Sequence, residues 1–288
     1  MAGTPDIVEN GDIVMDAVRA ADHDRYLSAL YAPADRRGAL LALYAFNAEI
    51  AGVRDRIHEP LPGEVRLQWW RDVILADGDA GTGHPTADAL RATIAAHHLP
   101  KTAFENMLEA RIFDLYDDPM PSRTDLEGYC GETAAALIQL AAMVLDPVAA
   151  PGFAELAGRA GCAQAITGLL LLLPLHRRRG QCFVPADILA ASGTTPEEFI
   201  KGEGGAAAER AVAAMIALAR EHLSAFEKGA AALPVSLRPA FLPLALTRAY
   251  LDKTETARRS PLGTTATLSI LRRHWLLLRH AMRGWTPL

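Results

Sequence analysis

Three consecutive arginines, Arg177, Arg178 and Arg179, form the densest positive cluster in the sequence. They follow the leucine-rich residues 168–175 and a single histidine, His176. A guanidinium group is a planar fork of N–H donors that binds phosphate oxygens in pairs, so the cluster suits a diphosphate or a phospholipid head group. A solvated helix C-terminus, where the helix dipole favours positive charge, is the alternative. His176 is a candidate catalytic group, although a lone histidine is more often a hydrogen-bonding core residue.

Carboxylates, which usually hold Mg²⁺ in proteins, are missing from a long stretch around this cluster. No Asp or Glu occurs between Glu155 and Asp187. A helix in this stretch cannot supply one side of a clamp in which Mg²⁺ ions bind a diphosphate. Two acidic pairs elsewhere are read as solvated turns: Asp117-Asp118, before Pro119, and Asp77 with Asp79, between glycines. We expect no metal site and no cofactor.

Four aromatic residues at helical spacing are read as core, with a pocket for an apolar chain as the alternative: Tyr44, Trp69, Trp70 and Tyr129. Tyr129 is also a candidate catalytic residue. The three cysteines are far apart and lack metal-ligand spacing, so they are expected to be buried packing residues in a reducing compartment. Neither a nucleophile-elbow motif nor a glycine-rich phosphate loop is present.

The bulk composition narrows the class of protein. Half of the 288 residues are hydrophobic, and the net charge is −5, which disfavours nucleic acid as a partner. The apolar run at residues 168–175 is too short for a membrane span, which needs roughly 20 residues. Residues 1–11 lack the apolar core of a signal peptide and are expected to form a flexible tail. We expect a cytoplasmic protein that can make peripheral contact with the inner membrane.

Apolar residues recur with the period of a helix along most of the chain. The pattern predicts helices over residues 35–57, 64–76, 102–116, 124–145, 153–179, 209–231, 235–253 and 265–283. Thr124, with Glu127 three residues later, is read as an N-cap, and Pro174 as a kink. The last helix carries Leu268, Leu271, Trp275 and Leu278. Short Gly/Pro loops and the absence of convincing strands predict one all-α domain over residues 1–288, with about ten helices.

Four strings in the correct order resemble the squalene/phytoene synthase family. They span about residues 24–250: Pro33 and Arg37 with Leu43-Tyr44-Ala45-Phe46; Arg66-Leu67-Gln68-Trp69-Trp70-Arg71; Asp114-Leu115 with Tyr129-Cys130; and Arg178-Arg179-Gly180-Gln181-Cys182-Phe183-Val184-Pro185. The resemblance implies an isoprenoid synthase-type helical bundle whose central cavity holds two prenyl diphosphates. It also makes Arg37, Tyr44 and Arg71 candidates for substrate or lipid binding.

Active members of that family carry two aspartate motifs that bind Mg²⁺, and this chain departs from both. In the first, Ala51 and Gly52 stand where adjacent aspartates are expected, and only Asp55 remains. Glu49 lies on a different part of the helix surface and is a poor substitute. In the second, the acidic positions fall on Leu172, Leu175 and His176, which implies an apolar wall. Asp55 is the one residual candidate for metal binding or catalysis.

The string Tyr44-Ala45-Phe46-Asn47-Ala48-Glu49-Ile50 is more similar to a branch with decayed motifs, which includes a mitochondrial assembly factor for respiratory complex I. The resemblance therefore implies a non-catalytic protein that binds an isoprenoid or another lipid, or that serves respiratory-complex subunits. Peripheral membrane contact is an expected extension. Two alternatives stay open: an active Mg²⁺-dependent prenyl transferase that joins two prenyl diphosphates, and a helical adaptor between proteins.

Overall fold

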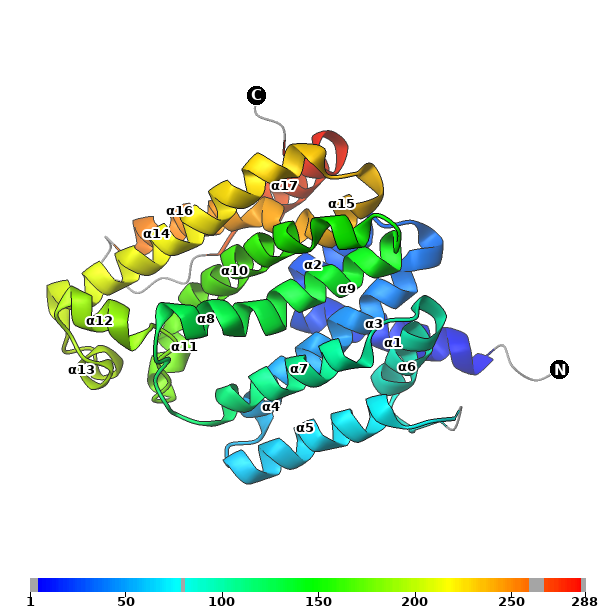
Figure 1. Ribbon diagram of the computed structural model, residues 1–288, viewed down its shortest axis with the longest axis horizontal. Coiled ribbons are helices and arrows are strands. Elements are labelled where there is room, and N and C mark those ends of the chain that lie inside the picture. The colour runs from blue at the N-terminus through cyan, green and yellow to red at the C-terminus, as the bar shows by residue number, and fades with distance from the viewer. Residues whose placement is uncertain (1–4, 79–80, 259–266, 286–288) are drawn as a thin grey trace. The chain divides into compact units, whose positions relative to one another are not determined.

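The computed structural model describes residues 5–78, 81–258 and 267–285, and in these ranges the chain is helical without strands (Figure 1). The prediction of an all-α fold is confirmed. Seventeen α-helical segments are present where about ten were expected, because several predicted helices are interrupted. The chain forms two compact units that alternate along the sequence. The single domain over residues 1–288 therefore stays a prediction.

The first unit comprises Met1–Leu115, Ala136–Ala154 and Pro234–Leu242. Its helices are α1 (Pro5–Ala21), α2 (His23–Ala29), α3 (Ala34–Ala51), α4 (Val53–Arg56), α5 (Pro60–Leu75), α6 (Pro85–His97), α7 (Lys101–Ile112), α9 (Ala136–Leu145) and α15 (Arg238–Phe241). Short 3₁₀ turns add η1 (Phe113–Leu115), η3 (Ala150–Phe153) and η5 (Val235–Leu237). Residues 5–11, expected to be a flexible tail, lie in α1.

Helix α3 is the core of the first unit, and it packs against α1, α6 and α9. Its residues 40–47 are all buried, which is the pattern of a helix covered on every side. The Phe46 ring makes edge contacts with Trp70 of α5 and Phe104 of α7, at centroid distances of 5.2 and 5.6 Å. Because such aromatic pairs bury large apolar areas, they fix these three helices together.

The second unit comprises Tyr116–Ala135, Glu155–Leu233 and Pro243–Leu288. Its helices are α8 (Arg123–Cys130), α10 (Ala154–Leu171), α11 (Leu173–Arg178), α12 (Ala186–Ser192), α13 (Pro196–Lys201), α14 (Gly205–Gly229), α16 (Thr247–Arg258) and α17 (Ile270–Arg283). The π-helical turn η2 (Gly131–Ala135) and the 3₁₀ turns η4 (Ala230–Ala232) and η6 (Leu242–Leu246) complete it. Figure 1 shows α14, α16 and α17 as neighbouring helices, and α14 is the longest, with 25 residues.

The π turn η2 joins α8 to α9, and Gly161 of α10 packs against it. A Cβ atom at Gly161 of α10 would lie 2.3 Å from the backbone nitrogen of Ala135. Only glycine fits this approach. The extra residue that a π turn inserts moves the chain sideways at this point, and such turns are enriched at functional sites.

Two predicted helix features need correction, and a third is confirmed. The N-cap of α8 is Ser122, whose hydroxyl accepts a hydrogen bond from the Asp125 backbone N–H, and not Thr124. The predicted helix over residues 235–253 is divided into η5, α15, η6 and the start of α16, with Pro239 and Pro243 removing backbone donors. The predicted kink near Pro174 is confirmed as a break at Leu172 between α10 and α11.

One run of helix, Arg123–Leu145, is long and apolar enough to cross a membrane by length and composition within the described chain. About half of its most apolar window, 56%, is buried in the protein, as expected of a core helix. It is a different run from residues 168–175, the apolar stretch that is too short to be a membrane span.

Candidate functional site

Helix α4 and the end of α3 carry the positions of the first expected acidic motif. Ala51 is the last residue of α3, and the Gly52 backbone N–H donates to the Ala48 carbonyl at 3.0 Å. A Cβ atom at Gly52 would also lie 3.0 Å from that oxygen, so glycine suits this turn. Asp55 follows on α4 and is exposed. The structure thus places the residual carboxylate at the surface of the first unit.

The Glu49 carboxylate is held by arginines of the same unit. Its Oε2 atom lies 2.9 Å from Arg56 Nη2 and 3.9 Å from Arg66 Nη2. The Arg66 guanidinium in turn lies 4.3 Å from the ring centroid of Trp69, a cation–π distance. Two positive partners leave Glu49 committed to ion pairs, which agrees with its interpretation as a poor substitute for a metal ligand.

Arg37 and Arg71 both bind oxygen atoms of the protein itself. Arg37 Nη2 donates to the Leu30 carbonyl at 3.1 Å and to the Ala32 carbonyl at 3.3 Å, where α2 has ended. Arg71 Nη2 pairs with Glu109 at 2.9 Å and so joins α5 to α7. Arg71 thus forms an ion pair within the protein, and Arg37 binds backbone carbonyl groups. A role in ligand binding stays a prediction.

Tyr44 lies in the interior of the first unit, with 2% of its surface exposed. The guanidinium carbon of Arg25 lies 6.0 Å from the ring centroid. Burial raises the pKa of Tyr44 to about 12, although the positive charge of Arg25 acts to lower it. The phenol is therefore neutral at any physiological pH, and its position fits the core interpretation.

In the second unit, α10 and α11 carry the positions of the second expected acidic motif. Pro174 has no backbone N–H to continue the ladder of α10, and the chain restarts as α11 with the Leu175 N–H donating to Leu172 at 2.9 Å. The Leu172 side chain is 49% exposed, and Leu175 is partly exposed. Two partly exposed leucines thus stand at the positions that the resemblance assigns to the second acidic motif.

Two candidate residues from separate parts of the sequence meet at one ring. His176 is buried, and its ring centroid lies 4.6 Å from that of Phe183. The ring centroid of Tyr129, on α8, lies 6.1 Å from that of the same phenylalanine. Phe183 was not a candidate by itself, because its only sequence signal was its place in the fourth matching string. The three rings form an aromatic cluster beside the arginines.

The three arginines have different surroundings. Arg177 Nε donates to the Ile200 carbonyl at 3.3 Å, and its guanidinium lies 5.8 Å from the Phe199 ring. A Cβ atom at Gly202 would meet Arg177 Nη2 at 2.3 Å, so Arg177 is packed against α13. Arg178 is exposed, and Arg179 is partly exposed. Anion binding by the three arginines stays a prediction.

A polar cluster that the sequence did not indicate links α8 to α14. Glu127 Oε1 accepts from Arg123 Nε at 2.9 Å and lies 3.0 Å from Nε2 of the buried His222. Burial acts to raise the pKa of Glu127, but the hydrogen bonds from Arg123 and His222 hold it below its usual value. Nearby, a hydrogen bond from Cys130 lowers the pKa of Cys162 against the effect of burial. All three cysteines are free and buried, as predicted.

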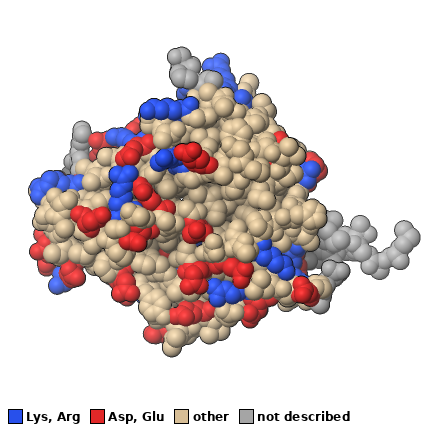
Figure 2. Space-filling view, viewed as in Figure 1, with Lys and Arg blue, Asp and Glu red and all other residues tan. Residues whose placement is uncertain are grey.

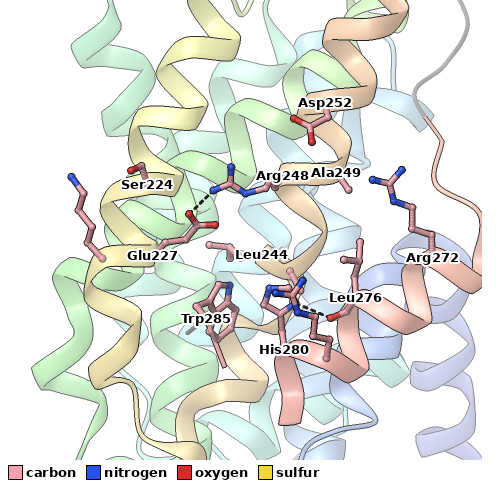
Figure 3. Close-up of a pocket in the computed structure, with 13 residues that line it drawn as sticks. Ser224, Glu227, Leu244, Arg248, Ala249, Asp252, Arg272, Leu276, His280 and Trp285 are labelled. Carbon is pink, nitrogen blue, oxygen red and sulfur yellow. Dashed lines mark hydrogen bonds and ion pairs between the residues drawn. The ribbon is translucent and has the colours of Figure 1, made fainter. Parts of the chain in front are cut away.

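A pocket of about 510 Å³ lies in the second unit between α14, α16 and α17 (Figure 3). Its charged lining residues are Glu227, Lys228, Arg248, Asp252, Arg272 and Arg279. The close-up shows Arg248 directed towards Glu227, with His280 and Trp285 at one end of the pocket. Trp285 is buried, and its ring contacts Phe226 at 5.0 Å.

Positive charge is in excess in this pocket. Both acidic groups are engaged by arginines: Glu227 pairs with Arg248 at 2.5 Å, and Asp252 pairs with Arg220 at 2.9 Å. Burial lowers the pKa of His280, which therefore adds no charge at neutral pH. Lys228, Arg272 and Arg279 are left as the surplus cations, and the pocket can hold a carboxylate or a phosphate group. The signal in the sequence was the run of arginines after Glu255, with no acidic residue beside them.

No three His, Cys, Asp or Glu side chains gather closely enough to hold a metal ion within residues 5–78, 81–258 and 267–285. The expectation of no resident metal stays a prediction.

Curated proteins similar to this chain include assembly factors of respiratory complex I and phytoene synthases. The complex I assembly factor 6 of Bos taurus is 29% identical over 247 residues, which cover 83% of this chain and 72% of that protein. The chloroplastic phytoene synthase 1 of Arabidopsis thaliana is 26% identical over 237 residues, covering 80% of this chain and 56% of that protein. The chain is thus similar to an assembly factor and to a synthase.

Solved structures and the family model agree on the fold. The crystal structure of a dehydrosqualene synthase in complex with a ligand superposes with a TM-score of 0.80 at 16% identity, covering 95% of this chain and 96% of that one. The resemblance in four short strings is confirmed by a family model that matches residues 18–278 as squalene/phytoene synthase. The chain belongs to the squalene/phytoene synthase family and has its isoprenoid synthase-type helical fold.

Proposed function

We propose that this chain is a non-catalytic member of its family that binds an isoprenoid or another lipid and serves in the assembly of a respiratory complex. The observation that supports the proposal most strongly is the carboxylate-free stretch that contains most of α10 and all of α11. It presents Leu172 and Leu175, and no Asp or Glu occurs between Glu155 and Asp187. Similarity to the complex I assembly factor of several animals supports the assembly role.

The physical reason is electrostatic. Ionisation of a prenyl diphosphate leaves a highly charged leaving group, and active synthases rely on Mg²⁺ to neutralise it. Without ligands for that metal the reaction is expected to be slower by many orders of magnitude. A leucine wall instead favours an apolar chain, because each fully buried leucine contributes about 1.5–3 kcal/mol. A neutral or singly charged lipid fits such a wall better than a diphosphate does.

Native mass spectrometry of protein purified from its own cells tests the lipid. We expect a copurifying lipid that is lost or reduced in Leu172→Asp, since an unpaired carboxylate against an apolar chain is costly. Leu61→Asp is the matched control, because Leu61 is an exposed leucine of α5, far more open than Leu172. Absence of any copurifying lipid, or equal lipid in all three proteins, would contradict the lipid-binding part and favour the adaptor alternative.

An assay with farnesyl or geranylgeranyl diphosphate and Mg²⁺ tests catalysis. We expect no condensed product, with or without Asp55→Ala. The active prenyl transferase is favoured by the similarity to phytoene synthases, and it predicts turnover that Asp55→Ala abolishes. That result would overturn the non-catalytic proposal.

A further inference from the structure

Helix α17 carries an apolar stripe on its outer side. Leu271, Trp275, Leu278 and Met282 follow one another at spacings of four, three and four residues, which places them on one face of a helix. Their side chains are between 42 and 84% exposed. Four large apolar side chains in one exposed row are unusual for a surface helix, whose apolar face normally points to the core.

The other side of α17 is the one that packs on the unit. Leu277 is fully buried, and Leu276 and His280 line the pocket with α14 and α16. The His280 ring lies 5.6 Å from the ring of Trp285. The helix is therefore attached by one face, and the stripe is a second apolar face that points away from the protein.

Arginines lie beside the stripe. Arg272, Arg279 and Arg283 are spaced by seven and four residues and form a row on one flank of it. Residues 256–288 contain six arginines and no acidic residue, while the whole chain has a net charge of −5. Residues 1–255 therefore carry a net charge of −11 (−5 − 6). On the face shown in Figure 2, acidic and basic side chains are interspersed.

This combination points to a negatively charged bilayer surface as the occupant of the stripe. Amphipathic helices that lie in a membrane interface place Leu and Trp in the acyl boundary and Arg among the head groups. Trp is favoured there because its ring is apolar with one polar edge, and Arg can keep its charge in the aqueous layer. An anionic surface would attract the C-terminal part of the chain and repel the acidic remainder, which sets one orientation.

A second copy of the chain is a poorer occupant. Two stripes packed face to face and antiparallel would bring both rows of arginines together. In a parallel pair each row would face the other flank of the partner helix, and α17 has no acidic residue to compensate in either case. The surplus cations Arg272 and Arg279 also line the pocket, so that an anionic head group at the flank of the stripe meets more positive charge. We infer that α17 docks the protein on anionic membranes through Leu271, Trp275, Leu278 and Met282. This inference does not depend on the proposed lipid ligand.

Flotation of the full chain with vesicles tests the inference. The vesicles are phosphatidylcholine alone, or phosphatidylcholine with phosphatidylglycerol, at low and high salt. We expect binding to the anionic vesicles that falls with salt. Arg272→Ala with Arg283→Ala should weaken it about 25-fold, or about fivefold per arginine. Leu271→Ser with Trp275→Ser should weaken it at both salt concentrations, because the apolar contribution is not screened.

Leu61→Ser with Val65→Ser is the matched control, since these residues form an exposed apolar pair on α5 at 72 and 70% exposure. It should bind like the parent, and circular dichroism should show all variants equally helical. The inference is overturned if the parent does not float with anionic vesicles, or if the α17 variants float as well as the control. It is also overturned if the parent is a dimer that Leu271→Ser with Trp275→Ser makes monomeric while vesicle binding is absent.

Discussion

Tyr44 places a phenol in the core of the first unit, and its hydroxyl has no hydrogen-bond partner among the described residues. A buried, unsatisfied hydroxyl is costly, whereas an apolar group of the same shape is not. We expect Tyr44→Phe to leave the free energy of unfolding unchanged at pH 7 or to raise it by about 1 kcal/mol. Chemical denaturation measures this directly. A loss of more than about 1 kcal/mol would show that the hydroxyl has a stabilising partner.

The raised pKa of Tyr44 also predicts how the stability of the protein depends on pH. The pKa of Tyr44 is about 12 in the folded protein and 10.0 in its reference state, so the folded form binds this proton more tightly. The protonated Tyr44 therefore makes its full contribution to the free energy of unfolding below pH 10, and this contribution is lost as the pH rises to about 12. The melting temperature of the parent should therefore fall more steeply in this window than that of Tyr44→Phe. Tyr116→Phe, at an exposed tyrosine, controls for the substitution and should follow the parent.

At the scale of residues, the sequence showed which chemical groups are missing better than it showed which contacts each side chain makes. The missing carboxylates between Glu155 and Asp187 can be read without a structure. The difference between Arg177 and Arg178 cannot, because it depends on Ile200 of α13 and on Gly202, which follows that helix. The meeting of Tyr129, His176 and Phe183 is likewise a product of tertiary packing.

At the scale of elements, the approach of α10 to the π turn η2 makes a sharp prediction. Gly161→Ala would place a methyl group within 2.5 Å of three atoms of Ala135, two of them backbone atoms that cannot rotate away. We expect a loss of at least 2 kcal/mol in the free energy of unfolding, roughly the cost of an overpacked core. Thermal and urea unfolding both measure it.

Gly158→Ala is the matched control on the same helix, one turn earlier. Nothing lies within 4 Å of a Cβ atom there, so only helix propensity changes. We expect a gain of about 0.5–1 kcal/mol, because alanine loses less backbone entropy than glycine in a helix. Equal effects of the two substitutions would contradict the close approach of Gly161 to Ala135.

Helix α17 shows why apolar periodicity predicted where helices lie better than it predicted which of their residues are buried. The apolar residues Leu268, Leu271, Trp275 and Leu278 indicated a helix over residues 265–283, and α17 begins at Ile270, so that Leu268 lies before it. Leu268 is buried, the other three are exposed, and Leu277, which was not singled out, is fully buried. Periodicity identifies an apolar face but not what covers it. Helix ends such as Ser122 and Gly52 were also missed, because single hydrogen bonds set them.

At the scale of the whole molecule, the resemblance predicted what composition could not. Half-hydrophobic composition with helical periodicity is shared by many all-α proteins, and only the ordered strings selected the squalene/phytoene synthase fold. The pocket of the second unit was not predicted, because its lining comes from three helices whose packing no local pattern encodes.

A thermal shift experiment on the whole molecule separates the proposed lipid binder from the alternative synthase. A ligand at 100 times its Kd stabilises the folded state by about 2.7 kcal/mol, which raises the melting temperature of a protein of this size by roughly 5 °C or more. A synthase would show this shift only when Mg²⁺ and a prenyl diphosphate are added together, because each completes the site of the other. We expect no such joint shift, since the described residues offer no cluster of three metal-ligating side chains. A neutral isoprenoid alcohol, added without Mg²⁺, should raise the melting temperature of the parent and raise that of Leu172→Asp less. A joint shift that Asp55→Ala removes would instead show that one carboxylate of the first motif still binds metal, and the chain would then be an enzyme with unusual ligands.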